Sequence, residues 1–374
     1  MTNRERAMRI LHYQSADRLP AVHFGYWYEL LMEWAEQGKI PREILDGYYD
    51  GGERDRQLDE IIGWDFNWQH MTSGHTGLAP GFEHKVLEVL PDGSQRVQNS
   101  LGVIERIFPG VISIPAEDDY TLKNREAFET LYRPKMQFFE GRINYDYFRS
   151  FNERVYEKTD TPIGLHLGSV MGDIRNMTSV IGMSYLMYDE DEELFADIVD
   201  TYAEMQYRCA EEVLKTGAKF DFAHYWEDIC FNSGPLLSPA LFDELTAKHY
   251  KKRNDLCHKY GIDIISLDCD GVTEKLLDTW FENGVNVMFP IEIGTWGDQF
   301  EAARKKYGEG MLGVGGMDKT VFRKDKAAVD GELERMRRLA SLGGFLPCPD
   351  HRLMPGSKFE LVQYYADEIK KIKI

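Results

Sequence analysis

Residues 238–268 read SPALFDELTAKHYKKRNDLCHKYGIDIISLD, and this stretch decides the fold. Its first part predicts a long helix, because Ser238 is a favoured N-cap, Pro239 fits the first turn and Gly261 stops the helix. The apolar run after Gly261 predicts a short buried strand that ends at Asp268. A helix followed at once by such a strand is the repeating unit of a parallel sheet.

The same alternation continues along the chain. Further apolar runs have strand character and are separated by helical stretches: 162–168, 219–225, 285–291, 311–316 and 343–348. Strands near residues 20 and 63 supply the remaining members. About eight such units favour a (β/α)8 TIM barrel over a doubly wound sheet, and no GxGxxG follows a strand. We expect one α/β domain over 1–374, with an N-terminal extension and an antiparallel β-hairpin excursion in 83–108 that turns at PDGS.

The chain is strongly acidic, with a formal net charge of -19. Such a surface repels nucleic acids and anionic membranes, so neither is an expected partner. Five cysteines, an odd number with no CxxC pair, argue against a disulfide framework and for a reducing compartment. Because no apolar stretch is long enough to cross a bilayer, we expect a cytoplasmic protein.

Ionisable side chains follow most of the predicted strands. In a barrel of this kind, the residues at the carboxyl ends of the strands form the active site. The candidates are His166, His224, Glu227, Asp228, Asp268, Asp270, Glu292 and His351. Two simpler explanations remain open: His166 as a packed, hydrogen-bonded core residue, and Asp270 as the cap of the following helix.

Four of these residues, Asp268, Asp270, Glu292 and His351, predict a metal site. Carboxylates and imidazole are ligands for a divalent cation such as zinc. Without a cation, neighbouring carboxylates raise one another's pKa and favour protonation. The competing hypothesis is that Asp268 and Asp270 act as general acid and base without a metal.

Aromatic residues are concentrated near the N-terminus, in HFGYWYELLMEW (23–34). Most residues of this kind belong to the core. Phe24, Tyr26 and Trp27 nevertheless follow the first predicted strand, so they also predict a wall for a flat, apolar ligand.

Three segments resemble the uroporphyrinogen decarboxylase superfamily: TNRERAMRILHYQSADRLPAV (2–22), GPLLSPALFDELTAKHYKKRNDLCHKYG (234–261) and GGFLPCPDHRLMPG (343–356). The resemblance extends over nearly the whole chain. It implies a (β/α)8 barrel, in agreement with the strand pattern. The superfamily contains true uroporphyrinogen decarboxylases and corrinoid-dependent methyltransferases.

The methyltransferase branch is the more similar of the two. In the decarboxylases a segment like RQAGRY follows the first strand, and its arginines hold the porphyrinogen carboxylates. The corresponding HFGYWYELL (23–31) contains no arginine. Thiol-activating methyltransferases bind zinc through a His-x-Cys motif and a later cysteine. The resemblance places Asp268, Asp270 and His351 at those three positions, so the ligand types differ from the family pattern and suit an oxygen substrate better than a thiol.

The resemblance therefore implies a methyltransferase of the O-demethylase type. A small O-methyl compound would be the donor, with aromatic compounds among the candidates. The cobalt of a separate corrinoid protein would be the acceptor, because the chain has no DxHxxG corrinoid signature. Asp268, Asp270 and Glu292 would activate the donor, with Glu227 completing the catalytic set. His166, His224 and Asp228 would orient the donor, and Phe24, Tyr26 and Trp27 would stack on it.

Two other hypotheses remain. The first is a metal-free decarboxylase acting on a small acid or a tetrapyrrole through Asp268 and Asp270. The second is a non-catalytic barrel that binds a tetrapyrrole or aromatic compound. Barrels of this kind often dimerise, so a homodimer is a further expectation.

Overall fold

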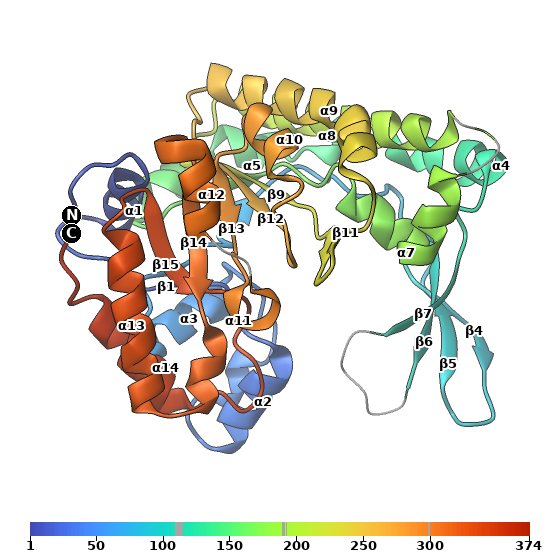
Figure 1. The fold of residues 1–374 in the computed structure, drawn as a ribbon. Coiled ribbons are helices and arrows are strands. Elements are labelled where there is room, and N and C mark those ends of the chain that lie inside the picture. Colours follow the sequence, from blue (N-terminus) through green and yellow to red (C-terminus); the bar gives the residue numbers. More distant parts are fainter. Residues whose placement is uncertain (109–114, 189–190, 192, 298–299) are drawn as a thin grey trace.

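Short parallel strands form the wall of a barrel, as the helix–strand alternation predicts (Figure 1). The computed structural model describes residues 1–374 except 109–114, 189–190, 192 and 298–299. Seven strands form one sheet in the order β15-β14-β13-β12-β9-β8-β3, and β1 pairs with β2. The barrel strands are β1 (Val22–His23), β2 (Phe66–Asn67), β3 (Met71–Thr72), β8 (Gly164–His166), β9 (Phe222–Trp226), β12 (Ile265–Asp268), β13 (Val287–Phe289), β14 (Leu312–Met317) and β15 (Phe345–Pro349).

The stretch 66–72 closes the barrel. β2 pairs with β1 and β3 pairs with β8, so this one segment joins the two sheets. On the other side β1 lies beside β15, and Tyr26 forms a parallel bridge with Leu353 just beyond the strand ends. With β2 and β3 counted as one strand, the barrel has eight strands, which confirms the predicted (β/α)8 fold.

Helices cover the outside of the barrel. α9 begins as predicted, because the Ser238 hydroxyl accepts a hydrogen bond from the Leu241 N–H at 3.2 Å. The longer helices are α1 (Asn3–Leu11), α2 (Tyr28–Glu36), α3 (Glu53–Ile62), α7 (Gly172–Met187), α8 (Leu194–Lys215), α9 (Pro239–Lys259), α10 (Leu277–Glu282), α12 (Phe300–Tyr307), α13 (Lys326–Ala340) and α14 (Phe359–Ile369). Four shorter helices are α4 (Arg125–Ala127), α5 (Tyr145–Arg149), α6 (Phe151–Arg154) and α11 (Ile293–Trp296).

A separate antiparallel sheet projects from the barrel beside α7 (Figure 1). Its strands are β4 (Lys85–Val89), β5 (Gln95–Gln98), β6 (Val103–Ile107) and β7 (Ala116–Tyr120). β4 and β5 are the predicted hairpin. The excursion is larger than predicted, because β6 and β7 extend it to four strands. A smaller hairpin of β10 (Cys230–Phe231) and β11 (Gly234–Pro235) follows β9.

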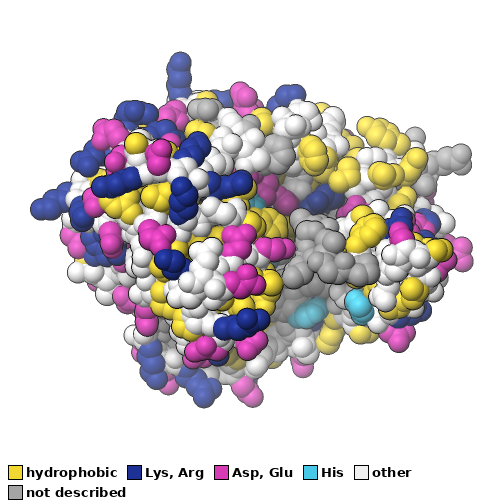
Figure 2. Space-filling model, turned by 90° about the horizontal axis from the view of Figure 1, so that it is seen from below, with side chains coloured by type: hydrophobic (Ala, Val, Ile, Leu, Met, Phe, Trp, Pro, Cys, Tyr) yellow, Lys and Arg dark blue, Asp and Glu magenta, His cyan; other side chains and the backbone are white. Residues whose placement is uncertain are grey.

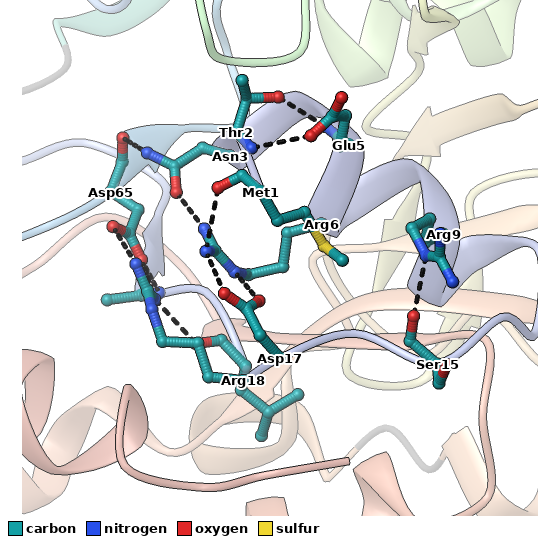
Figure 3. Close-up of polar contacts among 12 residues, drawn as sticks. Met1, Thr2, Asn3, Glu5, Arg6, Arg9, Ser15, Asp17, Arg18 and Asp65 are labelled. Atoms are coloured by element: carbon teal, nitrogen blue, oxygen red, sulfur yellow. Dashed lines mark hydrogen bonds and ion pairs between the residues drawn. The ribbon is translucent and has the colours of Figure 1, made fainter.

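The N-terminal extension is tied to the barrel by ion pairs (Figure 3). Thr2 and Glu5 form a capping box at the start of α1. The buried Arg6 donates to Asp17, with an Nε–Oδ1 distance of 2.7 Å. Arg18 donates two hydrogen bonds to Asp65, which precedes β2, at 2.6 and 2.9 Å.

Polar and aromatic side chains from several strands fill the interior of the barrel. The Trp68 ring stacks on Phe222, with centroids 4.2 Å apart. The indole N–H of Trp68 donates to the Ser266 hydroxyl at 3.3 Å, and the same hydroxyl lies 3.1 Å from His224 Nδ1. None of the helices in the described part of the chain has the length and apolar character needed to cross a membrane.

Candidate active site at the mouth of the barrel

The barrel strands end at one face, and ionisable side chains gather there. Figure 2 views the molecule from below and shows acidic side chains on this face. Asp228 and Ile291 at this face have φ angles of 50° and 59°. Left-handed backbone is uncommon for residues other than glycine and occurs often at functional sites.

Asp228, Asp268 and Asp270 form an acidic cluster with His351. One carboxylate oxygen of Asp228 accepts the backbone N–H of Asp270 at 3.0 Å. Asp270 Oδ2 lies 3.0 Å from His351 Nε2, so two residues that the sequence predicts as metal ligands, one just after β12 and one just after β15, are paired directly with each other. Asp268 accepts a hydrogen bond from the Gln69 amide at 3.1 Å.

Asp268 is the member of this acidic cluster with the most altered acidity. Its side chain is almost fully buried, at 3% exposure. Burial, followed by the nearby charges of Asp270 and Asp228, raises the pKa of Asp268 well above its usual value. This shift favours the protonated form of Asp268, which can then donate a proton.

Aromatic rings form one side of the mouth. The Trp27 ring stacks on the His351 imidazole with centroids 5.8 Å apart, and the Phe24 ring meets the same imidazole edge-on at 5.2 Å. Phe24 also packs edge-on against Phe289 at 4.6 Å. The predicted wall therefore contains Phe24 and Trp27.

Tyr26 does not belong to this wall. It is 2% exposed and packs against the rings of His23, Trp34 and Tyr48. Its predicted role in stacking on a ligand is not supported, because its ring is enclosed by these residues.

The predicted metal ligands do not assemble into a metal site. Glu292 Oε1 accepts a hydrogen bond from the buried Lys319 ammonium at 3.0 Å, and its Oε2 is buried with no hydrogen-bond partner among the described residues. The pKa of Asp268 is raised, which favours its protonated form, and Asp270 is paired directly with His351. Among the described residues, no group of three or more His, Cys, Asp and Glu side chains could hold a metal ion. Four-coordinate zinc needs at least three such ligands, so the donor set does not fit.

Glu227 has a structural environment that differs from the predicted catalytic one. Its carboxylate is fully buried and accepts the backbone N–H groups of Val170, Met171 and Gly172 at 2.6, 2.9 and 3.0 Å. It also accepts the Ser169 hydroxyl at 3.1 Å. These four bonds hold the N-terminus of α7, where a negative charge is stabilised by the helix dipole. Both carboxylate oxygens of Glu227 are therefore engaged by residues 169–172 and not by the acidic cluster.

His166 and His224 lie deeper in the barrel than the acidic cluster. They are register partners on β8 and β9, and their ring centroids are 6.2 Å apart. Burial lowers the pKa of His166 to about 4 and the pKa of His224 well below its usual value. Both imidazoles are therefore neutral at physiological pH.

Sequence reasoning missed several polar residues at the mouth. Gln69 follows the predicted strand near residue 63, so its place at a strand exit could have indicated it. Arg352 comes one residue after His351, a strand-exit residue that the sequence does indicate, and Lys319 comes two residues after the end of β14. No pattern in the sequence pairs Lys319 with Glu292, because the two are brought together by neighbouring barrel strands.

The fold and this mouth define a (β/α)8 barrel of the kind that carries active sites at its strand ends. The family profile described as "Uroporphyrinogen decarboxylase (URO-D)" matches residues 153–372. The chain belongs to the uroporphyrinogen decarboxylase family, as the resemblance in the sequence indicates. Membership of a family named for an enzyme supports an enzymatic role.

Comparison with solved structures agrees with this fold. A "methyltransferase from Methanosarcina mazei" is similar over 98% of this chain and 99% of its own, with 14% identity and a TM-score of 0.59. A B12-independent methionine synthase from Shewanella sp. W3-18-1 covers 95% of this chain and 98% of its own, with 11% identity and a TM-score of 0.49. At 14% identity the likeness to the Methanosarcina protein shows the fold alone, and no argument is based on the methionine synthase, whose TM-score is below 0.5. Comparison with curated proteins finds no significant match.

Proposed function

We propose that the protein is a methyltransferase that removes a methyl group from a small O-methyl donor, with Asp268 as the general acid. The observation that carries this proposal is the buried carboxyl group of Asp268, whose pKa is raised well above its usual value by burial and by Asp270 and Asp228. A carboxyl group that keeps its proton near neutral pH is suited to general acid catalysis. The methyltransferase that shares the fold is consistent with this function.

A methyl ether is unreactive because an alkoxide or phenoxide is a poor leaving group. In the proposed reaction Asp268 donates its proton to the ether oxygen as the bond between that oxygen and the methyl carbon breaks. The oxygen leaves as an alcohol or phenol, and the methyl group passes to the acceptor. A corrinoid carried by a partner protein would supply the attacking electron pair. Asp268 is left as a carboxylate and regains a proton from water at the mouth.

The residues around Asp268 suit an aromatic donor. Gln69 fixes the orientation of the carboxyl group through its 3.1 Å hydrogen bond. The half-buried Trp27 ring stacks on His351, and the buried Phe24 ring packs edge-on against the same imidazole and against Phe289. Ring pairs of this kind contribute about 0.5–1.5 kcal/mol beyond the area they bury.

Decarboxylation of a tetrapyrrole is the second candidate, because the family is named for that reaction. A protonated Asp268 could also protonate the carbanion that loss of CO2 leaves. The charges at the mouth favour this reaction less. Arg175 lies 3.6 Å from Asp228, Lys319 donates to Glu292, and Arg352 donates to Asp50. A polycarboxylate would have to compete with these carboxylates for each cation.

The test is a methyl-transfer assay with reduced cobalamin as the acceptor. The donors are methoxybenzene and 2-methoxyethanol, and the formation of methylcobalamin is followed by visible absorbance. We expect transfer by the parent protein and a loss of about 10²- to 10⁴-fold in the rate for Asp268→Asn, because removal of a general acid has effects of this size.

Asp146→Asn is the matched control, because that side chain is 99% exposed and far from the mouth. It should retain the parent rate. Release of CO2 from uroporphyrinogen, without methyl transfer from either ether, would favour decarboxylation and contradict the proposal.

A further inference from the structure

Two neutral imidazoles lie side by side beneath the acidic cluster, and neither takes part in the proton transfer proposed above. His166 and His224 face each other across the β8–β9 pair, with ring centroids 6.2 Å apart. His166 is partly exposed, whereas His224 is fully buried. What they can bind depends on which ring nitrogen carries the proton.

The hydrogen bonds of His166 place its proton on Nε2. The backbone N–H of Gly168 donates to His166 Nδ1 at 3.0 Å, so Nδ1 must be the unprotonated nitrogen. The ring is neutral, because burial and the charge of Arg253 lower its pKa to about 4. His166 therefore presents an Nε2–H donor.

The hydrogen bonds of His224 lead to the same tautomer. The Ser266 hydroxyl accepts the indole N–H of Trp68, and His224 Nδ1 is its only acceptor among the described residues. The hydroxyl proton therefore points to Nδ1, and His224 carries its own proton on Nε2. His224 Nε2 is buried and has no hydrogen-bond partner among the described residues. An unmet buried donor is unfavourable, and a ligand oxygen would satisfy it.

A buried positive charge lies near His166. Arg253 is 1% exposed and donates one N–H to the Leu167 carbonyl at 2.9 Å. Its Nε and Nη2 have no hydrogen-bond partner within the described part of the chain. This charge favours an anionic oxygen over a neutral one at the imidazole pair. At the mouth above, Asp228, Asp270 and Glu292 each face a basic side chain, and Asp268 is protonated, so repulsion of an anion is reduced.

We propose that His166 and His224 form a subsite that binds a carboxylate of the methyl donor through two Nε2–H donors. Ser266 lies level with His224, and Asp268 is two residues further along the same strand. Two residues of a strand span about 6.6 Å, so the subsite and the general acid are separated by roughly the length of a para-substituted benzene ring. This part of the inference rests on the proposed function, and it names the donor class as aromatic carboxylates with a methoxy group opposite the carboxylate.

Binding and tautomer measurements test the subsite without any methyl transfer. Calorimetry would compare 4-methoxybenzoate with methoxybenzene, which lacks the carboxylate. We expect 4-methoxybenzoate to bind at least about tenfold more tightly to the parent protein, since hydrogen bonds to a charged group are the stronger kind. This advantage should be lost in His166→Phe and retained in His258→Phe, a control at an exposed position on α9.

Nitrogen-15 NMR of the histidine-labelled parent protein provides a second measurement. It does not depend on whether a variant folds. We expect both rings as Nε2–H tautomers at pH 7, and their Nε2 signals should shift when 4-methoxybenzoate is added. Ser266→Ala keeps both rings but removes the hydroxyl that donates to His224 Nδ1. Both His224 tautomers should then be populated, and 4-methoxybenzoate should lose part of its affinity advantage over methoxybenzene.

Equal binding of the two probes by the parent, or a proton on Nδ1 of either ring, would overturn the subsite. If the methyl-transfer assay fails while the tautomers and the carboxylate preference are as expected, the proposed function fails and the subsite stands. If transfer from methoxybenzene proceeds and the two probes bind equally, the subsite fails and the proposed function stands.

Discussion

At the scale of single residues, the acidity of Asp268 controls the proposed chemistry. The same carboxyl group on an exposed loop would be ionised and useless as an acid at neutral pH. Here burial and two neighbouring aspartates oppose its ionisation. The sequence places Asp268 and Asp270 together, but it does not show that Asp228 approaches from another strand and that Gln69 reaches across the barrel.

The pH dependence of the reaction should report this acid. Because the protonated form of Asp268 is the active one, the rate of methyl transfer should be highest below its raised pKa and should fall as the pH rises through it. Asp268→Asn has no titrating group at this position. Its low residual rate should therefore not decrease as the pH rises through this range. The measurement is kcat against pH for the parent and the variant. A parent rate that rises over the same range would instead indicate a general base.

His166 should make the fold sensitive to mild acid. Its folded-state pKa of about 4 lies below the ordinary value of about 6.5, so the unfolded chain binds more protons between these two pH values. The free energy of unfolding should therefore be at its full value above about pH 6.5 and fall by up to about 3 kcal/mol as the pH approaches 4.

Urea unfolding of the parent and of His166→Phe at pH 7 and pH 5 measures this effect. The variant should lose less stability than the parent between the two pH values, by about 2 kcal/mol. An identical loss in both proteins would show that His166 titrates normally.

At the scale of secondary structure elements, Glu227 connects β9 to the N-terminus of α7. It accepts four hydrogen bonds from residues 169–172, and a Cβ at Gly172 would overlap the Glu227 backbone. A carboxylate at a strand exit looks catalytic in the sequence. In the folded protein the start of α7, which is distant in sequence, donates hydrogen bonds to this carboxylate. Glu227 therefore has a structural role.

Replacing this carboxylate should therefore reduce stability. Glu227→Gln loses the charge and turns one acceptor into a donor that faces a backbone N–H. We expect a cost of about 1–3 kcal/mol in the free energy of unfolding, as for a buried donor left unsatisfied. Glu282→Gln, at an exposed position at the end of α10, should change it by less than about 0.5 kcal/mol. If Glu227→Gln has parental stability but no methyl transfer, the result would instead support a catalytic role for Glu227.

At the scale of the whole molecule, closure of the barrel brings the exits of β1, β12, β13 and β15 to one mouth. The 66–72 stretch and the Tyr26–Leu353 bridge complete the ring of strands. This closure sets Trp27 and Phe24 against His351, and His351 against Asp270. It also brings Lys319 to Glu292, so one oxygen of this predicted metal ligand is hydrogen-bonded to a buried ammonium group.

Metal content tests this arrangement directly. Because Lys319 donates to Glu292, Asp270 is paired with His351 and burial favours the protonated form of Asp268, we expect no tightly bound zinc ion, which needs at least three such ligands. Elemental analysis of protein purified without chelators should find far less than one metal ion per chain. About one zinc per chain, lost in both Asp270→Ala and His351→Ala, would contradict the pairing seen here.

By itself, the sequence determined the order of helices and strands, the barrel, the β4–β5 hairpin and the strand exits that bear Asp268, Asp270 and His351. These features follow from local periodicity, caps and turn residues, which neighbouring residues specify. Only the tertiary structure decided which ionisable groups meet. The pairing of Lys319 with Glu292, the bonds of Glu227 to α7, the enclosure of Tyr26 and the protonation of Asp268 depend on residues far apart in the chain. Burial and charge–charge interactions arise when the barrel closes, because acidity depends on the surroundings of a group in space.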